Sequence, residues 1–355
     1  MIPHTVLSLT LTNMAFRKRF EEYITHLQDQ IVTGLEQLDS SAPKFERDNW
    51  TRKEGGGGCS CVFAIPNPTR LDETNTILEK AGVNTSIVHG SLPPAAVKQM
   101  RSEHASLPTD TQGALPFYAA GISLIVHPRN PHAPTVHANY RYFEVADPKD
   151  PSNIVTWWFG GGCDLTPSYL YEKDAIHFHE TLKNACDRHA PGVLHRPFKK
   201  WCDEYFYIPH RKETRGIGGI FFDDLNSADH HLLPTDKDPS SSRPRSQEEI
   251  FNFVKSCGNS FLSSYLPILE NRAKTPFNEQ QRRWQLLRRG RYVEFNLVCD
   301  RGTKFGLNTP GARIESILMS LPETARWEYQ SEVGADLESE EGKLLEVVRN
   351  PREWA

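Results

Sequence analysis

Residues 135–144 read Thr-Val-His-Ala-Asn-Tyr-Arg-Tyr-Phe-Glu, and this alternation of small or apolar with polar side chains constrains the fold most. β-Branched and aromatic residues in alternation, directly after Pro134, predict a strand. Successive side chains of a strand point to opposite faces, so His137, Asn139 and Arg141 share one face at steps of about 7 Å. That row suits an anionic ligand rich in N–H and carboxylate groups. The alternative is a solvated face of an antiparallel sheet.

Composition sets the broad class of the chain. The 355 residues include 38% hydrophobic and 24% charged residues, as in an ordinary globular enzyme. Lys and Arg number 41 and Asp and Glu 45, which gives a net charge of −4. A chain without a basic excess is not expected to bind nucleic acid or a membrane surface. An anionic ligand therefore requires a local cationic pocket.

Cysteine usage and apolar runs predict where the protein works. The seven cysteines are odd in number and form no Cys-x-x-Cys pair, which favours a reducing compartment. The sequence has no run of 18 apolar residues, so no membrane span is expected. In the first 22 residues, basic residues follow a mildly apolar segment and glutamates come next, which fits neither a secretory signal nor a transit peptide. A cytoplasmic protein is therefore predicted.

Periodicity along the chain predicts an α+β fold. Apolar positions at helical spacing predict helices at residues 14–38, 94–101, 169–188, 198–206, 247–265, 278–289 and 313–320. Short apolar or alternating segments predict strands at residues 59–65, 85–89, 122–127, 136–144, 154–159, 219–222 and 292–299. The strands come in clusters rather than in β-α-β alternation, which favours a mostly antiparallel sheet. A length of 355 residues allows two domains but does not require them.

A second dense segment, residues 157–167, carries a bulky strand into three glycines and then a single carboxylate, Asp164. Glycines permit a flat ligand to approach the backbone closely. Asp164 could accept hydrogen bonds from ligand N–H groups, or it could cap local backbone amides. The sequence leaves both interpretations open.

The third segment, residues 292–302, is predicted as an alternating strand that ends in Asp300 and Arg301. The alternative function for this pair is an ion pair that closes the strand end. The loop at residues 305–313 follows and offers backbone amides and the guanidinium of Arg313. That combination suits the capture of carboxylates, because a guanidinium binds them in a bidentate way.

Other motifs favour structural roles. The glycines at residues 55–58 precede a strand rather than a helix, so a turn or close backbone approach is preferred to a phosphate loop. Residues 227–247 are rich in Ser, Pro, Asp and Lys and are predicted to form a mobile surface insertion, in which His230 and His231 are expected to be solvated. The remaining histidines show no metal-binding spacing, and histidines satisfied by hydrogen bonds are the expectation.

Several long motifs in the same order give the chain a family resemblance. They occupy residues 127–131, 134–141, 157–167, 200–211, 216–224, 300–303 and 313–322. From about residue 12 to 330, the chain resembles the oxygen-dependent coproporphyrinogen III oxidases. The main departure is the 227–247 insertion, which is longer than the family's usual connection.

The resemblance implies an activity and an assembly. The family converts two propionates of coproporphyrinogen III to vinyl groups, giving protoporphyrinogen IX and CO2 and consuming O2. It implies a single domain spanning residues 1–355, built on a large flat antiparallel sheet flanked by helices on both sides. It also implies a homodimer with contacts near residues 82–90 and 292–312. No dinucleotide fingerprint is visible in the sequence, and catalysis without an organic cofactor is favoured.

The resemblance also implies roles for particular residues. The catalytic candidates are His137, Asp164, Asp300 and Arg301, with the aspartates holding or deprotonating pyrrole N–H groups and His137 matching a proton donor. The candidates for substrate binding are Ser123, Asn139, Tyr140, Arg141, Gly311, Ala312 and Arg313. Histidines that match a divalent-metal set in some family members are His127, His137, His177 and His210. A histidine-ligated metalloenzyme of another class and a tetrapyrrole carrier without enzymatic activity are the competing hypotheses.

Overall fold

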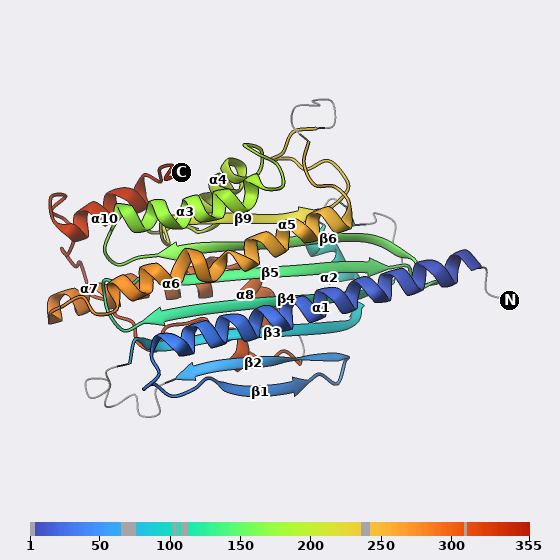
Figure 1. Cartoon of the computed structure of the whole chain (residues 1–355), viewed down its shortest axis with the longest axis horizontal. Coiled ribbons are helices and arrows are strands. Elements are labelled where there is room, and N and C mark those ends of the chain that lie inside the picture. The colour runs from blue at the N-terminus through green and yellow to red at the C-terminus, as the bar shows by residue number, and fades with distance from the viewer. Residues whose placement is uncertain are drawn as a thin grey trace.

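A single seven-stranded sheet forms the centre of the protein (Figure 1). The computed structural model describes residues 4–64, 76–101, 104, 106–107, 113–235, 242–308 and 311–355, with side chains from residue 14 onward except those of residues 99 and 305. The strands are β1 (Glu46–Thr51), β2 (Gly56–Ala64), β3 (Leu78–Leu92), β4 (Leu115–Pro128), β5 (Thr135–Ala146), β6 (Ile154–Thr166) and β9 (Gly218–Leu225). They lie in the order β1-β2-β3-β4-β5-β6-β9, and every neighbouring pair is antiparallel.

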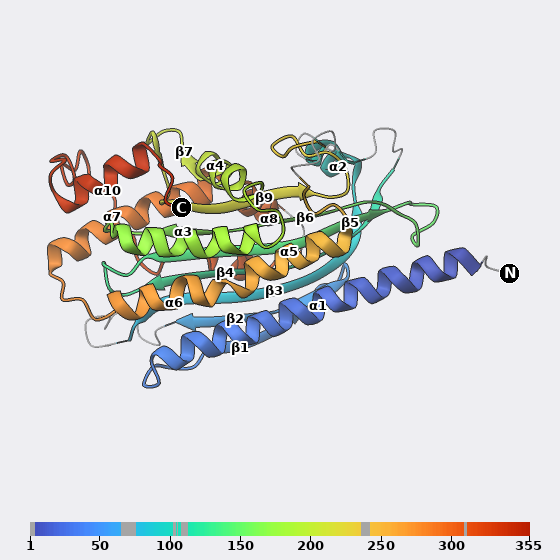
Figure 2. The same cartoon turned by 45° about the horizontal axis from the view of Figure 1, so that its top comes forward.

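Helices lie on both faces of this sheet. On one face are α1 (His4–Leu38), α3 (Glu172–Asp187), α5 (Gln247–Asn259) and α6 (Phe261–Arg272), which cross in front of the strands in Figure 1. Figure 2, turned by 45°, shows the same four helices still in front of the strands. The other described elements are α2 (Pro94–Met100), α4 (His195–Tyr205), β7 (Tyr207–Ile208), β8 (Glu213–Thr214), α7 (Glu279–Glu294), η3 (Phe295–Cys299), α8 (Arg301–Asn308), α9 (Ile314–Leu318) and α10 (Glu340–Arg349). The predicted α+β fold with an antiparallel sheet is confirmed.

The hydrophobic core fills the space between α1 and the sheet. Phe20, Ile24 and Ile31 of α1 are fully buried at helical spacing. They pack in one cluster with Tyr140 and Tyr142, the alternate residues of β5. Burying large aromatic and aliphatic side chains is the main favourable contribution to folding. The core therefore occupies one face of the sheet and leaves the opposite face available to polar side chains.

The predicted strand at residues 292–299 is wrong. Those residues complete α7 and continue into the π-helical turn η3. Asn278 begins α7 with a capping box, since its side chain accepts from the Gln281 amide at 3.0 Å and Gln281 accepts from the Asn278 amide at 2.9 Å. Tyr292, Phe295 and Asn296 are buried at spacings of three and one, which is one face of a helix. Alternation over a short apolar segment cannot separate these two cases.

The segment predicted as a mobile insertion is partly packed. His230 is buried rather than solvated, and its Nε2 lies 3.0 Å from the carbonyl oxygen of Asp223. Arg243 is also buried and donates to the carbonyls of Asn226 and Pro244. These contacts satisfy backbone carbonyls that a connection at the end of β9 would otherwise leave unpaired. Residues 236–241 of the predicted insertion lie outside the described residues.

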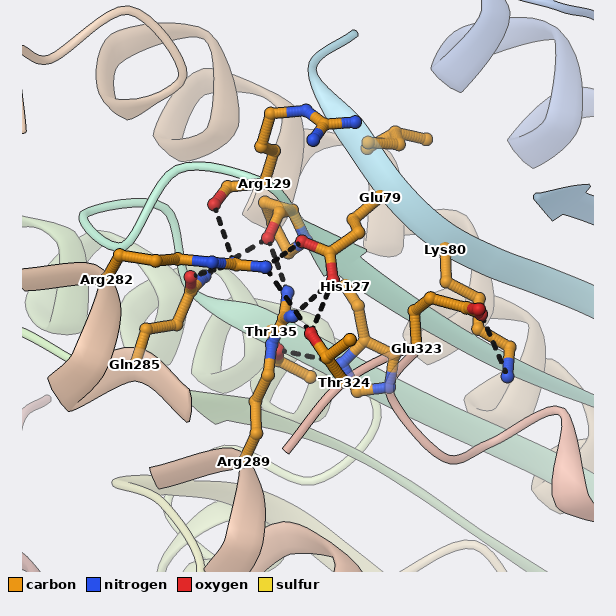
Figure 3. Close-up of polar contacts among 12 residues, drawn as sticks. Glu79, Lys80, His127, Arg129, Thr135, Arg282, Gln285, Arg289, Glu323 and Thr324 are labelled. Carbon is orange, nitrogen blue, oxygen red and sulfur yellow. Dashed lines mark hydrogen bonds and ion pairs between the residues drawn. The ribbon is translucent and has the colours of Figure 1, made fainter. Parts of the chain in front are cut away.

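A buried ion network attaches α7 to the sheet (Figure 3). The carboxylate of Glu79 on β3 is fully buried and accepts from Arg289 at 2.6 Å and from Arg282 at 2.7 Å. Thr324 donates to the same carboxylate at 3.2 Å, which ties the segment after α9 to this point. Burial opposes ionisation of Glu79, but the two guanidinium groups outweigh it and lower the pKa to about 2.

We expect Glu79→Gln to destabilise the protein by about 3–5 kcal/mol at pH 7, because it leaves the buried guanidinium of Arg289 and the partly buried one of Arg282 without their counter-charge. A depressed carboxyl pKa contributes stability above its unfolded value, and that contribution is lost as the pH falls from about 4.5 towards about 2. Urea unfolding of parent and variant should therefore give curves that converge in acid. The control is Glu323→Gln, which loses only a 3.9 Å pair with Lys80 and should cost less than about 1 kcal/mol. Equal losses in both variants would contradict this account.

Candidate active site

The polar row of β5 lies on the sheet face opposite α1. Ser123 is paired with Asn139 across β4 and β5, and directly opposite residues of antiparallel strands point to the same face. His137, Asn139 and Arg141 are half-buried, whereas the residues between them are buried. The prediction that these three share a face is confirmed. We call the surface defined by Ser123, His137, Asn139 and Arg141 the polar face.

Small side chains make part of the polar face nearly flat. In one cross-strand row the register aligns Gly58, Ser86, Gly121 and Arg141. A Cβ atom on Gly121 would first meet the neighbouring strand, at the Tyr140 carbonyl and at Arg141. The Trp50 ring lies over Gly58, where an added Cβ atom would meet it at 2.5 Å, so the stretch of small side chains covers β3 and β4 beside Arg141. Such a surface accommodates a broad ligand.

A buried carboxylate stands beside this surface. Asp164 lies directly opposite His137 in the β5–β6 register, and its Oδ1 is 2.8 Å from His137 Nδ1. Its other oxygen accepts from Arg215 at 2.7 Å. Burial opposes ionisation of Asp164, but Arg215 and the His137 hydrogen bond outweigh it and lower the pKa below its usual value. Asp164 therefore orients His137, whose Nε2 has no hydrogen-bond partner in the described part of the chain.

Arg215 is a site residue that the sequence analysis did not identify. It is 2% exposed and also donates to Asn296 at 2.9 Å. Its guanidinium lies over the rings of Phe206 and Tyr292, at 4.1 and 4.4 Å from their centroids. An arginine before a Gly-Ile-Gly-Gly segment has no sequence periodicity that would mark it as buried. The one feature of the sequence that could have pointed to Arg215 is the family motif at residues 216–224, which begins directly after it.

Asp300 occupies a different setting from Asp164. It precedes α8 and caps it, because its Oδ2 accepts from the Thr303 amide at 2.6 Å. Its Oδ1 accepts from the Tyr205 hydroxyl at 2.8 Å. The Arg301 guanidinium lies 5.0 Å from the centroid of the Tyr205 ring. The alternative of an ion pair at a strand end is wrong, since no strand ends there.

Cations lie at two separated places on the polar face. Arg141 on β5 donates to Asp223 of β9 at 2.7 Å and to Asn139 at 3.1 Å. Arg313 forms an ion pair with Asp48 of β1, a residue in the same cross-strand row as Ser123. Four strand spacings of about 4.8 Å separate β1 from β5. Between these two places, α9 contacts the same row, because Ser316 bonds Ser60 at 2.9 Å and its carbonyl accepts from Asn84 at 3.2 Å.

The remaining predicted substrate-binding residues differ in their access to this face. Gly311 has φ +72°, and its Cα faces Glu54 at the β1 end, which places Gly311 and Ala312 near the cation at Arg313. The Tyr140 side chain is fully buried under the helices, on the opposite face of the sheet. A role for Tyr140 in binding on the polar face can therefore come only from its backbone. The alternation of β5 already indicated this opposite orientation.

The four histidines of the predicted metal set do not form one site. Within the described residues, no group of three or more His, Cys, Asp or Glu side chains could hold a metal ion. His127 is buried, with Nε2 3.0 Å from the Ser320 carbonyl and Nδ1 3.1 Å from Thr135, so both ring nitrogens are engaged. Burial lowers the pKa of His127 to about 3. His177 and His210 lie elsewhere, against the Ser263 carbonyl and against Glu294.

A hollow of about 300 Å³ lies between α3 and α5, away from the polar face. The described residues that line it are Thr181, Asn184, Ala185, Arg188, Ser256, Asn259, Ser260 and Ser263, which include no carboxylate or histidine. It therefore lacks the acid–base groups found on the polar face. In the part of the chain that the structure describes, no helix is long and apolar enough to cross a membrane.

The fold and the site together define an enzyme with its acid–base groups gathered on one sheet face. A sequence model of the family "Coproporphyrinogen III oxidase" matches residues 19–354. The oxygen-dependent coproporphyrinogen-III oxidase of Drosophila melanogaster is 52% identical over 95% of this chain and 78% of its own length. The mitochondrial enzyme of that name from Homo sapiens is 52% identical over 95% of this chain and 67% of its own length. A chloroplastic one from Glycine max is 50% identical over 97% and 80%.

The chain therefore belongs to the coproporphyrinogen III oxidase family, an oxidoreductase family. The family match extends to residue 354, beyond the limit near residue 330 that the motifs predicted. It includes α10 and the segment leading to it, which pack against Trp284 of α7 in the main core. The resemblance predicted from the motifs is confirmed.

We expect Arg215→Met to destabilise the protein by about 3–5 kcal/mol, because Asp164 would remain buried without its guanidinium. The double variant with Asp164→Asn should lose less than the sum of the two single variants, since the two groups interact directly. Chemical denaturation at pH 7 measures all three. Arg211→Met is the control: Arg211 is 38% exposed and pairs with Glu294, so its loss should stay within about 1 kcal/mol. Strict additivity of the single variants would contradict the proposed coupling.

Proposed function

We propose that this protein catalyses the oxygen-dependent oxidative decarboxylation of coproporphyrinogen III to protoporphyrinogen IX in haem biosynthesis. Each of two propionates becomes a vinyl group: R–CH2–CH2–COO⁻ + O2 + H⁺ gives R–CH=CH2 + CO2 + H2O2. The side chain loses two electrons and its carboxylate, and O2 takes up the two electrons. Membership of the family and relatives named for this activity support the proposal.

One observation about the site carries this proposal furthest. The polar face combines a surface of small side chains with cations at two ends and a carboxylate at one of them. The substrate is a macrocycle with four pyrrole N–H groups and four carboxylates. Such a ligand needs carboxylates for its N–H groups and guanidinium groups for its propionates. A site for a small neutral ligand would need neither the breadth nor the separated cations.

We assign the removal of a pyrrole proton to Asp300 rather than to Asp164. Both oxygens of Asp164 are held in the interior by Arg215 and His137. Asp300 is only half-buried, and among the described residues its carboxylate accepts hydrogen bonds from two neutral donors, the Tyr205 hydroxyl and the Thr303 amide. A carboxylate without a directly bound cation is the better base. His137, oriented by Asp164, then acts as proton donor through Nε2, and Arg141, Arg301 and Arg313 hold propionates.

We further propose that O2 reacts with the substrate without an organic cofactor. Loss of a pyrrole proton makes the ring electron-rich, so that it can pass electrons to O2 directly. The four-histidine metal set does not fit the arrangement of those residues, and no step is assigned to a metal. Activity of chelator-treated protein with its metal content measured tests this point, because full turnover at negligible metal supports the proposal and a proportional loss contradicts it.

The central experiment is incubation of the purified protein with coproporphyrinogen III in the presence and absence of O2. We expect protoporphyrinogen IX, two CO2 and consumption of O2 aerobically, and unchanged substrate anaerobically. Mass spectrometry and absorbance after oxidation of the porphyrinogens identify the products. A carrier would bind the substrate and release no CO2 under either condition, which would overturn the proposal.

Asp300→Asn should abolish turnover by a much larger factor than it weakens binding. The amide keeps the shape of the side chain and removes the base, and general-base catalysis contributes about 10²–10⁴-fold. Steady-state kinetics with binding measured in the absence of O2 separate the two effects. Asp229→Asn, at an exposed position after β9, is the matched control and should behave as the parent. Near-normal turnover of Asp300→Asn would remove this residue from the chemistry.

Arg141→Ala should weaken substrate binding by roughly 2 kcal/mol, or about 30-fold in Kd, if this guanidinium pairs with a propionate. Losing one partner of a buried charge pair costs about 2–5 kcal/mol. The lower value applies to Arg141 because its side chain is 36% exposed without substrate. Anaerobic titration monitored by fluorescence measures the affinity. Arg211→Ala, which removes a cation outside the polar face, serves as the control. An unchanged Kd for Arg141→Ala would return the β5 row to a solvated-face interpretation.

We also propose that the protein works as a homodimer. Four apolar side chains on η3, α8 and α9 are 37–55% exposed. They are Leu297, Val298, Leu307 and Ile314. These residues fall in or beside the predicted contact segment 292–312. The other predicted segment, residues 82–90, lies in β3, whose two edges are already paired, so a partner can meet it only face-on.

Val298→Asp should shift the protein from dimer to monomer, because it places a charge in the proposed apolar contact. Turnover should fall as well, because α8 begins three residues later, at Arg301. Sedimentation velocity over a range of concentrations measures the assembly. The control is Leu337→Asp, at a position 57% exposed before α10, which should remain dimeric. A parent protein that sediments as a monomer at micromolar concentration would contradict the proposal.

The cytoplasmic location predicted from the sequence is retained as a proposal. The relatives from Homo sapiens and Glycine max are named mitochondrial and chloroplastic, which indicates organellar locations for those proteins. The feature that supports the proposal is the cysteine usage, since all seven cysteines are free thiols, as in proteins of a reducing compartment. Cell fractionation with antibodies against the native protein tests it, and recovery in an organelle would overturn it.

A further inference from the structure

The hydroxyl of Tyr205 is the side-chain donor that holds Asp300. Tyr205 is the last residue of α4, and its hydroxyl donates to Asp300 Oδ1 at 2.8 Å. The second oxygen of Asp300 accepts from a backbone amide in α8, at Thr303. The carboxylate is thus fixed between two elements that are far apart in the sequence. Its orientation towards the polar face depends on both contacts.

The Tyr205 ring is itself held firmly. It stacks on Phe221 of β9 with centroids 4.1 Å apart and planes 14° from parallel. Phe295 of η3 meets it edge-on at 6.0 Å. Phe221 lies in the same cross-strand row as Asn139, so the stack stands at the β9 edge of the polar face. The ring cannot rotate without disturbing packing from two elements, and the hydroxyl is therefore preorganised.

The surroundings keep this phenol in its donating form. Burial raises the pKa of Tyr205, and the adjacent Asp300 carboxylate raises it further, while Arg301 and Arg141 oppose this. The charged or titratable groups around Asp300 come from four other places: Arg141 on β5, Arg215 before β9, Tyr292 on α7, and Cys299 in η3. These four groups act on Asp300 from a distance, whereas Tyr205 makes a direct hydrogen bond to its carboxylate.

We propose that Tyr205 is a positioning residue for the reaction: its hydroxyl aims the Asp300 carboxylate at the pyrrole N–H and sets how readily that carboxylate takes a proton. The inference rests on the proposed role of Asp300 as the base. A neutral donor favours the ionised carboxylate without supplying a positive charge that would make it a poor base. A cation in the same place, as Arg215 is for Asp164, would fix the carboxylate but reduce its basicity.

The test is Tyr205→Phe, which keeps the ring, its stack on Phe221 and the cation–π contact with Arg301. We expect kcat to fall about ten- to a hundredfold with KM changed by less than about threefold, because the carboxylate is no longer aimed at the pyrrole N–H. The acidic limb of the kcat–pH profile should move to higher pH, because the ionised carboxylate loses a hydrogen bond that favours it. A residue that acted only in packing would move neither this limb nor kcat at constant KM.

Two further variants provide the controls. Tyr207→Phe removes a hydroxyl two residues away, on a side chain that is 40% exposed, and should leave kcat and the pH profile as in the parent. In the Asp300→Asn background, Tyr205→Phe should cost no more than about twofold, since its partner no longer acts as a base. An unchanged kcat and pH limb in Tyr205→Phe, or its full penalty on top of Asp300→Asn, would overturn the inference.

Direct titration of Asp300 separates this inference from the proposed function. Carbon-13 NMR of aspartate-labelled protein without substrate, with the Asp300 signal assigned from its loss in Asp300→Asn, follows the carboxyl group itself. An upward shift of this titration in Tyr205→Phe supports the inference on the contact even if Asp300→Asn proves fully active, in which case only the role as base fails. An unmoved titration overturns the inference whatever the activity of the variants.

Discussion

The ion pairs of the buried Glu79 carboxylate are the interactions on which the placement of α7, η3 and α8 depends. This carboxylate pairs with the buried Arg289 and the partly buried Arg282 and so holds α7 against β3. Because α7 continues directly into η3 and then α8, this one attachment sets where Asn296 and Asp300 lie. A buried ion pair of this kind is weak evidence for net stability, since desolvation offsets much of the attraction. Its contribution here is geometric: it gives α7 one position on the sheet.

The same use of buried charge recurs closer to the polar face. Asp164 is held by Arg215 and faces His137, and Arg215 in turn binds Asn296 of η3. Asn296 donates to the hydroxyl of Ser320, whose carbonyl meets His127 beside the Glu79 network. Polar contacts thus continue from the attachment of α7 to the group that orients His137. The two aspartates receive opposite treatment, because one is neutralised by a cation and the other is held by a phenol and an amide.

Parts of this arrangement were predictable from local sequence pattern. The period of two in residues 135–144 placed His137, Asn139 and Arg141 on one face and the Tyr140 side chain on the other, since strand geometry leaves no choice. The clustered strands predicted the antiparallel sheet. The strand predicted at residues 292–299 was wrong, because eight residues of alternating character are compatible with both a strand and a helix. The capping box at Asn278, fourteen residues earlier, decided it as a helix. The prediction that His230 is solvated was wrong for a related reason. Composition cannot show that its ring nitrogen hydrogen-bonds the backbone carbonyl of Asp223 in β9.

What the sequence by itself determined, then, is the set of periodicities: which side chains share a strand face, where helices begin, and which motifs match a family. Only the tertiary structure decided which groups act on one another. Arg215 reaches Asp164 across 51 residues, and Tyr205 reaches Asp300 across 95. No local pattern encodes such pairs, because they form only when η3 and α4 pack at the β9 edge of the sheet. The physical reason is that hydrogen bonds and ion pairs act over a few ångströms in space, irrespective of separation along the chain.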